Sequence, residues 1–421
     1  MPTEFKNRVF GCAIIKAINS NYNADFTHQP RTLPNGVVYA TDKALKYLIK
    51  NYLLKNFSNE KIFYFKSYNE NMNPLSLDER YKFMFDEYPK VVKETNEYSI
   101  FYYNGEEIIG RINQKPNATK MKNYFNKLEN DNAKKDFQSI LNKWSKKNEC
   151  KLTTTNSIGK NDKVFGDEEF FFYINGNNQI IKLEGEFETL KELINDLDYL
   201  LTGGIDKHAV LKNLLKCLDV KLFGATFAGA TNISIHGTVQ INHGVNRFPE
   251  NSIYSEQIMS PFRNPGEAGS EEKAMTTLGT QSKLKEGHYV HHFSVNPKNM
   301  DDHFTRVGDK TIMLSTEDID KLKEAIRRGA TYYDSASKAG TENELLVWVQ
   351  LKPESKLILP NFTELIVVTR DEDAVKIDMK RLTDELSKDN VKSEIEKIEI
   401  YYNNTNTEIL NSPSNISKSE L

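Results

Sequence analysis

Asn21-Tyr22-Asn23-Ala24-Asp25, Pro30-Arg31, Asn35-Gly36 and Thr41-Asp42-Lys43-Ala44-Leu45-Lys46-Tyr47-Leu48-Ile49-Lys50-Asn51-Tyr52-Leu53 form the stretch that decides the fold. Its apolar residues Leu45, Leu48, Ile49, Tyr52 and Leu53 recur at helical spacing, and we expect them to pack on an apolar strand at 9–17. Thr41 is a candidate N-cap, with Asp42 in the first turn. Lys43, Lys46 and Lys50 recur at i, i+3 and i+7, so their ammonium groups leave from one side of the helix. A loop of side-chain amides followed by this lysine ridge favours the binding of a polyanion. The alternative is that the lysines form an ordinary solvated helix face.

Later blocks return to the same core. Residues 220–227 and 233–240 read as two strands, and the block from Leu278-Gly279 through His288-Tyr289-Val290 leads into Val295-Asn296-Pro297. Ser315 and the acids after it predict a helix over 316–329 that ends at Gly329. A buried strand at 345–351 and a returning strand at 356–359 follow. This order predicts an α+β fold with an antiparallel sheet and helices on one face.

These blocks resemble the backbone subunit of CRISPR Cascade complexes, type I-B in particular. That family reads Asn-Pro-Asn-Gly-Asp, Pro-Arg, a Gly turn and Thr-Asp before a basic helix, and later Leu-Phe-Gly and Gly-Pro-Val-Gln. The sequence departs from this pattern at Tyr22, Ala24, Tyr47 and Thr238, where the family has Pro, Gly, a basic residue and Pro. The blocks occur in family order, apart from 56–215 and the tail.

The resemblance implies an RRM-like, ferredoxin-type palm with an inserted fingers lobe and a protruding thumb loop. We expect residues 1–55 and 216–410 to form the palm, and 56–215 to form the insertion. Hairpins are predicted at 99–111 and at 170–183, and helices at 120–146 and 187–201. The Pro- and Gly-rich segment within 258–287 is the expected thumb loop, since long loops inside domains are usually functional or disordered. Residues 411–421 are expected to form a flexible tail.

The charge is unevenly distributed along the chain. The formal net charge is −3, yet residues 1–55 hold eight basic and three acidic side chains. No apolar run approaches the roughly 18 residues that a membrane span needs, and no membrane partner is expected. Cys12, Cys150 and Cys217 are odd in number and far apart, which favours a reducing compartment. The absence of a secretory signal makes a cytoplasmic location the expectation.

Other chemistries find less support in the sequence. His288 and His292 share a face of a strand and His291 points away, so we expect surface or groove histidines and no metal site. No phosphate-binding glycine motif occurs, and no cofactor or catalytic residue is expected. In related type III subunits an aspartate in a comparable loop supports metal-dependent RNA cleavage. A ribonuclease using Asp25 is therefore one alternative, although we expect Asp25 to order its own loop. A protein-interaction scaffold without RNA is the other.

The resemblance implies a CRISPR RNA (crRNA)-binding backbone subunit that polymerises along the guide in antiviral defence and is not an enzyme. The expected partners are crRNA, further copies of the chain, other Cascade subunits and, through the guide, target DNA. Arg31 and the three lysines would bind phosphates, whereas Asn21, Asn23 and Gln240 would donate to phosphate or sugar. The loop from Ser260 to Lys285 would reach the next copy. The expected RNA-binding residues are Asn21, Asn23, Arg31, Lys43, Lys46, Lys50, Gln240, Ser260, Arg263, Lys283 and Lys285.

Overall fold

Strand β1 (Val9–Ser20) lies at the centre of the main sheet. It pairs antiparallel with β11 (Leu278–Val295) on one side and with β12 (Thr341–Leu351) on the other. Its first nine residues are all buried, because other layers cover both faces of the sheet. This is the strand predicted at 9–17.

The computed structural model describes residues 3–90, 205–259, 278–371, 374–414 and 416–421, together with short strands at 151–152, 172–175 and 179–181. The chain divides into two compact units, Met1–Asp86 with Leu211–Leu421, and Glu87–Val210. In the second unit, β4 (Phe172–Asn175) pairs antiparallel with β5 (Gln179–Ile181) and with β3 (Lys151–Leu152). The β4–β5 pair confirms the hairpin predicted at 170–183.

The main sheet of the first unit has nine strands in the described chain. Its order is β17-β15-β12-β1-β11-β9-β2, with β8 and β10 also paired to β11. The outer strands are β2 (Tyr39–Ala40), β8 (Val239–Ile241), β9 (Gly244–Asn246), β10 (Ile253–Met259), β15 (Ile395–Tyr402) and β17 (Ser417–Glu420). The antiparallel centre and the flanking helices confirm the mixed α+β class.

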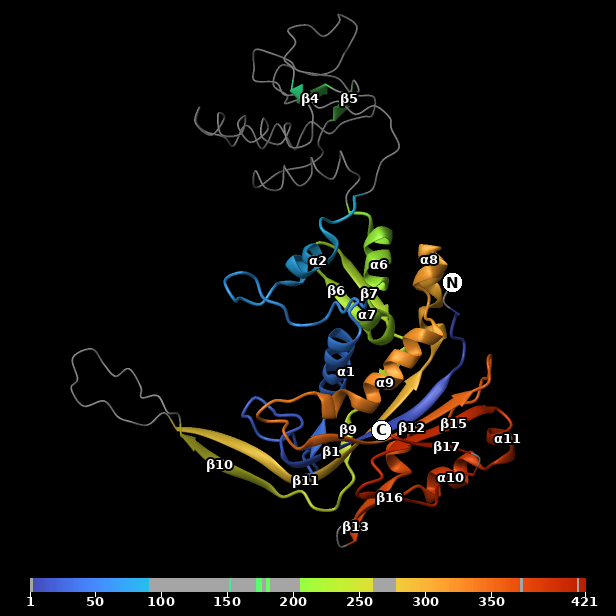
Figure 1. The fold of residues 1–421 in the computed structure, drawn as a ribbon. Helices are drawn as coiled ribbons and strands as arrows, with labels where there is room; N and C mark the ends of the chain where they lie inside the picture. The colour runs from blue at the N-terminus through green and yellow to red at the C-terminus, as the bar shows by residue number, and fades with distance from the viewer. Residues whose placement is uncertain are drawn as a thin grey trace, which may run out of the picture. The chain divides into compact units, whose positions relative to one another are not determined.

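Alternate side chains of β1 enter two different hydrophobic cores. Ala13 and Ile15 pack with helices α1 (Asp42–Asn56) and α9 (Thr316–Tyr332), which lie on one face of the sheet (Figure 1). Cys12 and Ile14 pack with the small C-terminal layer on the opposite face. This alternation follows from the two-residue period of a strand. The five apolar residues predicted for the first helix are all in the helical core.

The C-terminal layer contains a second sheet, ordered β13-β14-β16. Its elements are β13 (Val367–Asp371), β14 (Ala374–Asp378), α10 (Lys380–Leu386), α11 (Asp389–Lys392) and β16 (Thr407–Leu410). The remaining elements are α2 (Leu77–Phe85), α6 (Lys207–Leu215), α7 (Leu218–Phe223), α8 (Asp301–Val307) and the antiparallel pair β6 (Gly224–Ala228) and β7 (Asn232–His236).

Strands β10 and β11 form an arm that leaves the main sheet (Figure 1). The pairing of β1 with β11 reaches only to Ser20 and Leu284, so the part of β11 before Leu284 pairs with β10 alone. Residues 278–287 were predicted as part of the thumb loop, and this prediction is wrong, because they form the first half of β11. The tip, including Ser260 and Arg263, lies outside the described residues.

Further boundaries differ from the predictions. Residues 220–223, predicted as part of a strand, lie in helix α7, and the strand β6 begins at Gly224. Residues 56–86 and 211–215 belong to the first unit and not to an insertion. Residues 417–420 form the edge strand β17 and not part of a flexible tail, because they pair in parallel with β15. Residues 356–359 form no strand, since β12 pairs instead with β1 and β15. The hairpin predicted at 99–111 and the helices at 120–146 and 187–201 lie outside the described residues.

Helix α9 begins as predicted and ends later than predicted. The Ser315 hydroxyl accepts a hydrogen bond from the Asp318 amide and the Asp318 carboxylate accepts one from the Ser315 amide, which together form a capping box. The helix continues past Gly329 to Tyr332. Gly329 serves close packing instead, since a Cβ at this position would lie 3.1 Å from the Leu48 carbonyl oxygen of α1.

Candidate nucleic-acid interface

The side-chain amide of Asn23 fixes the loop before α1 to the start of the helix. The Oδ1 atom of Asn23 accepts hydrogen bonds from the Thr41 amide at 2.9 Å and from the Thr41 hydroxyl at 3.0 Å. Thr41 occupies the N-cap position, as predicted, but its side chain makes no capping hydrogen bond. Asn23 therefore ties the loop to the first turn of the helix.

Asn21 connects the same loop to the arm. Its side chain is 3% exposed, and its Nδ2 donates to the carbonyl oxygens of His28 and Ser282, both at 3.2 Å. Its Oδ1 has no hydrogen-bond partner among the described residues. The geometry thus gives the amide hydrogens of Asn21 a structural role, whereas donation to RNA was predicted for them.

The tip of the loop is held by its own hydrogen bonds and exposes an aromatic ring. The Oδ1 atom of Asp25 accepts from the Thr27 amide, the Thr27 hydroxyl and the Gln29 amide, which confirms that Asp25 orders its own loop. The hydrogen bonds, that from the Thr27 hydroxyl first, lower the pKa of Asp25. Phe26 is 97% exposed. The Arg31 guanidinium lies 5.9 Å from the centroid of the Phe26 ring, and Nε of Arg31 donates to the Ala24 carbonyl oxygen.

The three helix lysines differ in their surroundings. Lys43 is exposed. Lys46 lies 2.9 Å from the Asp42 carboxylate, which also has His243 at 3.9 Å. Lys50 donates to the Tyr64 carbonyl oxygen at 2.8 Å, and burial lowers its pKa. The predicted ridge is therefore one exposed cation and two cations that already have partners within the chain.

Tyr47, between these lysines on the helix, belongs to an aromatic cluster. Its ring stacks on Phe65 with centroids 5.4 Å apart and planes 13° apart, and it meets Tyr333 edge-on, also at 5.4 Å. The hydroxyls of Tyr47 and Tyr333 are 3.3 Å apart. Burial and this hydrogen bond raise the pKa of Tyr47 to about 12. A departure from the family pattern at Tyr47 was the only sequence signal for this cluster.

Lys338 is a basic residue that was not among the predicted site residues. Its Nζ donates to the Tyr22 carbonyl oxygen and lies 5.5 Å from the Tyr22 ring centroid. Burial lowers its pKa to about 8. Its place after Ser335-Ala336-Ser337 in a family-like block was the signal that could have identified it. The Lys338 ammonium therefore lies against the backbone of the loop before α1.

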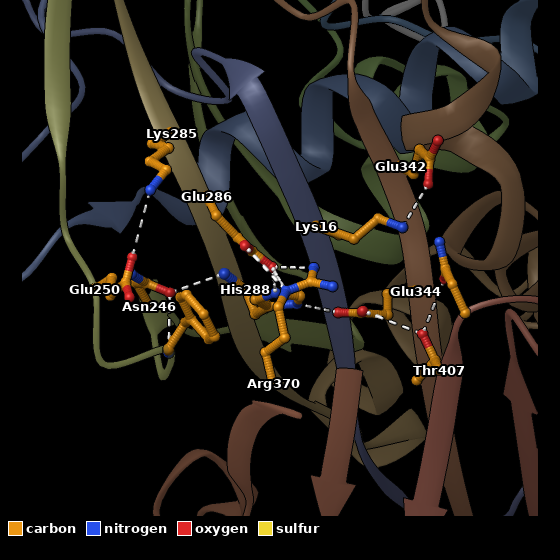
Figure 2. Close-up of polar contacts among 12 residues, drawn as sticks. Lys16, Asn246, Glu250, Lys285, Glu286, His288, Glu342, Glu344, Arg370 and Thr407 are labelled. Atoms are coloured by element: carbon orange, nitrogen blue, oxygen red, sulfur yellow. Dashed lines mark hydrogen bonds and ion pairs between the residues drawn. The ribbon is translucent and has the colours of Figure 1, made fainter. Parts of the chain in front are cut away.

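The remaining predicted residues lie apart from that loop. Gln240 is exposed on β8, and its Nε2 donates to the Gly237 carbonyl oxygen. Lys283 lies on the arm, 3.1 Å from Glu256. Lys285 is 4.0 Å from Glu250 and well exposed (Figure 2). The arm lysines therefore face carboxylates on their own hairpin or next to it.

The three histidines of β11 are structural. His288 and His291 are fully buried, so their prediction as surface or groove residues is wrong. His288 lies between Glu286 and Glu344, and Arg370 pairs with Glu286 (Figure 2). His291 contacts the Tyr22 hydroxyl and the Asn242 carbonyl oxygen, whereas His292 accepts from the Phe362 amide. Burial lowers the pKa of both His291 and His292 to about 4.

Within the residues that the structure describes, no group of three or more His, Cys, Asp or Glu side chains is placed to hold a metal ion. No helix in the same part of the chain is long and apolar enough to cross a membrane.

Comparison with known proteins places the chain in a family. No curated protein matches the chain. Two solved chains, titled "CRISPR RNA-guided surveillance complex, pre-nicking" and "CRISPR RNA-guided surveillance complex", are each 10% identical to it, with TM-scores of 0.43 and 0.40. Both alignments cover 98% of this chain and 96% of the other. At such TM-scores the likeness supports no argument about function. The family model described as CRISPR-associated protein Cas7 matches residues 7–385, and the chain therefore belongs to this family.

Proposed function

We propose that this chain is a crRNA-binding backbone subunit of a type I-B Cascade effector complex. The observation that carries this proposal is the family match over residues 7–385, which includes the loop before α1, the basic helix and the arm. Several copies would line up along one guide RNA, beside other Cascade subunits. Recognition of target DNA would then depend on base pairing by the guide and not on protein side chains.

The proposed RNA path follows the cations that remain accessible. Lys43 is exposed at the start of α1, and the Arg31 guanidinium keeps donors beyond the one used on Ala24. Such groups bind phosphate and set register without reading sequence. Lys338 lies behind the loop, where its charge would add to the positive potential. The fixed geometry of the loop limits the ordering cost of binding.

The arm is the proposed contact between neighbouring copies. It is a two-stranded extension, and most of β10 is exposed. Such a contact joins two different surfaces, so it builds an open filament whose length the RNA limits. The palm, fingers and thumb of the family would correspond to the main sheet with its helices, the Glu87–Val210 unit and the arm.

We propose no catalytic role. Asp25 is the residue on which a ribonuclease reading would rest, and its Oδ1 accepts three hydrogen bonds within its own loop. A general base must instead be able to reach the proton that it removes. No observation favours the ribonuclease or the RNA-free scaffold as a second candidate.

Purification of the tagged chain from its native host, followed by sequencing of the nucleic acid that accompanies it, tests the proposal. We expect short RNAs that share a repeat-derived end and differ in their spacers. Random cellular RNA, or no RNA, would overturn the backbone function. Incubation of the bound RNA with Mg²⁺ then tests cleavage, and we expect intact RNA.

A further inference from the structure

An open groove of about 370 Å³ lies beside the aromatic cluster of α1. Its walls include Lys50 from α1, the segment from Phe63 to Ser67, and Arg80 from α2. The volume is within the range of roughly 300 to 1,000 Å³ that is typical of small-ligand pockets. Among the described residues that line the groove, Lys50 belongs to the lysine ridge and none belongs to the loop before α1.

The charge of the groove is of one sign. Lys50, Lys66 and Arg80 contribute to its lining, and none of the described residues that line it is acidic. Asp219 is buried behind the wall, where its carboxylate accepts the amides of Phe63 and Tyr64 at 2.7 and 2.8 Å. The Asp219 charge acts on Lys50 and Arg80 from inside the protein. The three cations outnumber this one buried carboxylate, so the lining is complementary to an anion.

An aromatic ring completes the lining. Phe65 lines the groove, and Tyr47 lies nearly parallel against it while Tyr333 braces Tyr47 edge-on. A stacked aromatic pair offers a flat surface on which any nucleobase can stack. Stacking of a base on an aromatic side chain contributes about 1–3 kcal/mol per base in other proteins. An anionic group and a planar ring together describe a nucleotide.

The wall of the groove is fixed before any ligand arrives. The guanidinium of Arg80 donates to the carbonyl oxygens of Ile62 and Phe63 and to the Ser67 hydroxyl, at 2.7, 3.1 and 2.8 Å. The Asp219 carboxylate in turn accepts hydrogen bonds from the backbone amides of Phe63 and Tyr64. Fixed walls lower the cost of ordering a ligand, so the three donors of Arg80 serve the shape of the site more than direct binding.

We propose that this groove holds one nucleotide of the bound RNA, with its base against Phe65 and its phosphate at Lys50 and Lys66. The proposal rests on the RNA-binding function proposed above and names a contact specific to this chain. Tyr47 stands where the family has a basic residue, so stacking would replace a phosphate contact there. Lys66 is exposed, with its ammonium 5.0 Å from the Tyr68 ring centroid, and its charge is available to a phosphate.

Photocrosslinking of the complete ribonucleoprotein tests the proposal without any substitution. RNA that contains 4-thiouridine is assembled with the full chain, irradiated, and the modified peptide is mapped by mass spectrometry. We expect cross-links on the peptides that contain Phe65 and Tyr47. Efficient RNA binding with cross-links confined to other peptides would overturn the nucleotide groove and leave the backbone function intact. If the wild-type chain bound no RNA, the backbone function itself would fail.

Affinity measurements with matched variants provide the second readout. Phe65→Leu keeps apolar volume and removes the ring, and we expect it to weaken RNA binding by about 5- to 150-fold, the equivalent of the stacking range. Phe65→Trp should restore binding. Tyr332→Leu is the control, because Tyr332 is 46% exposed and packs edge-on against Tyr52 on another surface. Equal affinities for Phe65→Leu and wild type would overturn the proposal.

A free mononucleotide is the other source of the same chemistry. AMP, added in excess to the assembled complex, should leave the cross-links on Phe65 and Tyr47 unchanged. If AMP abolished these cross-links while RNA stayed bound, the groove would be a site for free nucleotides, and its assignment to the RNA strand would be wrong.

Discussion

The Nδ1 atom of His288 lies 2.5 Å from Oε2 of Glu344, and neither side chain is exposed to solvent. The other ring nitrogen, Nε2, is 3.1 Å from Glu286, whose carboxylate also accepts from Arg370 of β13 (Figure 2). Thr407 of β16 donates to Glu344 at 3.3 Å. This chain of contacts joins the central strands β11 and β12 to the small C-terminal sheet.

Replacement of His288 by Ala should destabilise the first unit by about 3–5 kcal/mol, because it leaves Glu344 buried without its cationic partner. Chemical denaturation followed by circular dichroism measures this loss. Lys285→Ala is the control, since that side chain is exposed and 4.0 Å from an exposed carboxylate. A His288→Ala variant as stable as this control would contradict the ionic link.

The stability of the fold should depend on the protonation of His288. Burial alone would lower the pKa of His288, but the charges of Glu344 and Glu286 outweigh burial and raise it. Because the folded pKa is higher than the unfolded value of about 6.5, the stabilisation is complete below that value and is lost as the pH rises through the folded pKa. The Tm of the wild type should therefore fall as the pH rises above about 6.5.

Glu344→Gln is the matched variant for this measurement, since it removes the charge that raises the pKa and keeps the size of the side chain. Its Tm should fall less steeply over the same pH range. Superimposable Tm profiles for the two proteins would show that His288 is not the titrating group.

Gly329→Leu should destabilise the protein by about 1–3 kcal/mol, although leucine favours helices more than glycine does. The reason is that a Cβ at this position would lie only 3.1 Å from the Leu48 carbonyl oxygen of α1. Thermal denaturation measures the effect. Gly279→Ala is the control, because only one backbone atom would lie within 4 Å of a Cβ there. An unchanged Tm for Gly329→Leu would mean that α1 and α9 move apart at little cost.

Lys43→Ala should reduce the slope of log K against log salt concentration for RNA binding by about 0.7, the value for one lost phosphate contact with a single strand. Lys46→Ala should change it less, because the Lys46 ammonium is already paired with Asp42. Salt titrations of RNA affinity compare the two variants and the triple variant with Lys50→Ala. If the wild type and the triple variant had equal slopes, the lysine face of α1 would be an ordinary solvated surface that contacts no phosphate.

Asp25→Asn should bind RNA nearly as well as the wild type, since an amide oxygen can accept the same hydrogen bonds as Oδ1. Asp25→Ala loses all three and should bind RNA less tightly, with faster amide exchange over residues 24–31. Hydrogen exchange and RNA affinity measure both effects. If the two variants were equally impaired, the charge of Asp25 would matter more than its hydrogen bonds.

Replacement of residues 260–277 by Asn-Gly should leave a folded protein, because Met259 and Leu278 are paired and a two-residue turn can close such a hairpin. If the tip of the arm joins neighbouring copies, this variant should bind one RNA segment but form no arrays. Electron microscopy of complexes on long RNA measures array length, and circular dichroism checks the fold. Arrays of normal length would assign the contact between copies to another surface.

Local patterns were enough to predict the parts of the fold that depend on neighbouring residues. The apolar spacing of 45–53 identified the packed face of α1, and Ser315 identified the start of α9. The pattern at 170–183 identified the β4–β5 hairpin. Each of these signals acts within one or two turns of chain, where the periodicity of helix and strand relates sequence directly to geometry.

Residue type and spacing could not predict which polar groups remain free. Lys46 and Lys50 share the face of Lys43, yet Lys46 pairs with Asp42 and Lys50 uses one of its donors on the Tyr64 carbonyl oxygen. Asn21 was predicted to donate to RNA, yet its side-chain amide donates to the carbonyl oxygen of Ser282, 261 residues later in the chain. Pairing of this kind depends on where distant segments meet.

The sequence by itself determined the α+β class, the central strand, the first helix and the resemblance to the Cascade backbone family. Only the tertiary structure decided that residues 278–287 form the first half of β11, that His288 and His291 are buried, and that Phe65 lies between Tyr47 and a cationic groove. The physical reason is that burial and long-range pairing are properties of surfaces brought together by folding, whereas propensity and periodicity belong to the local chain.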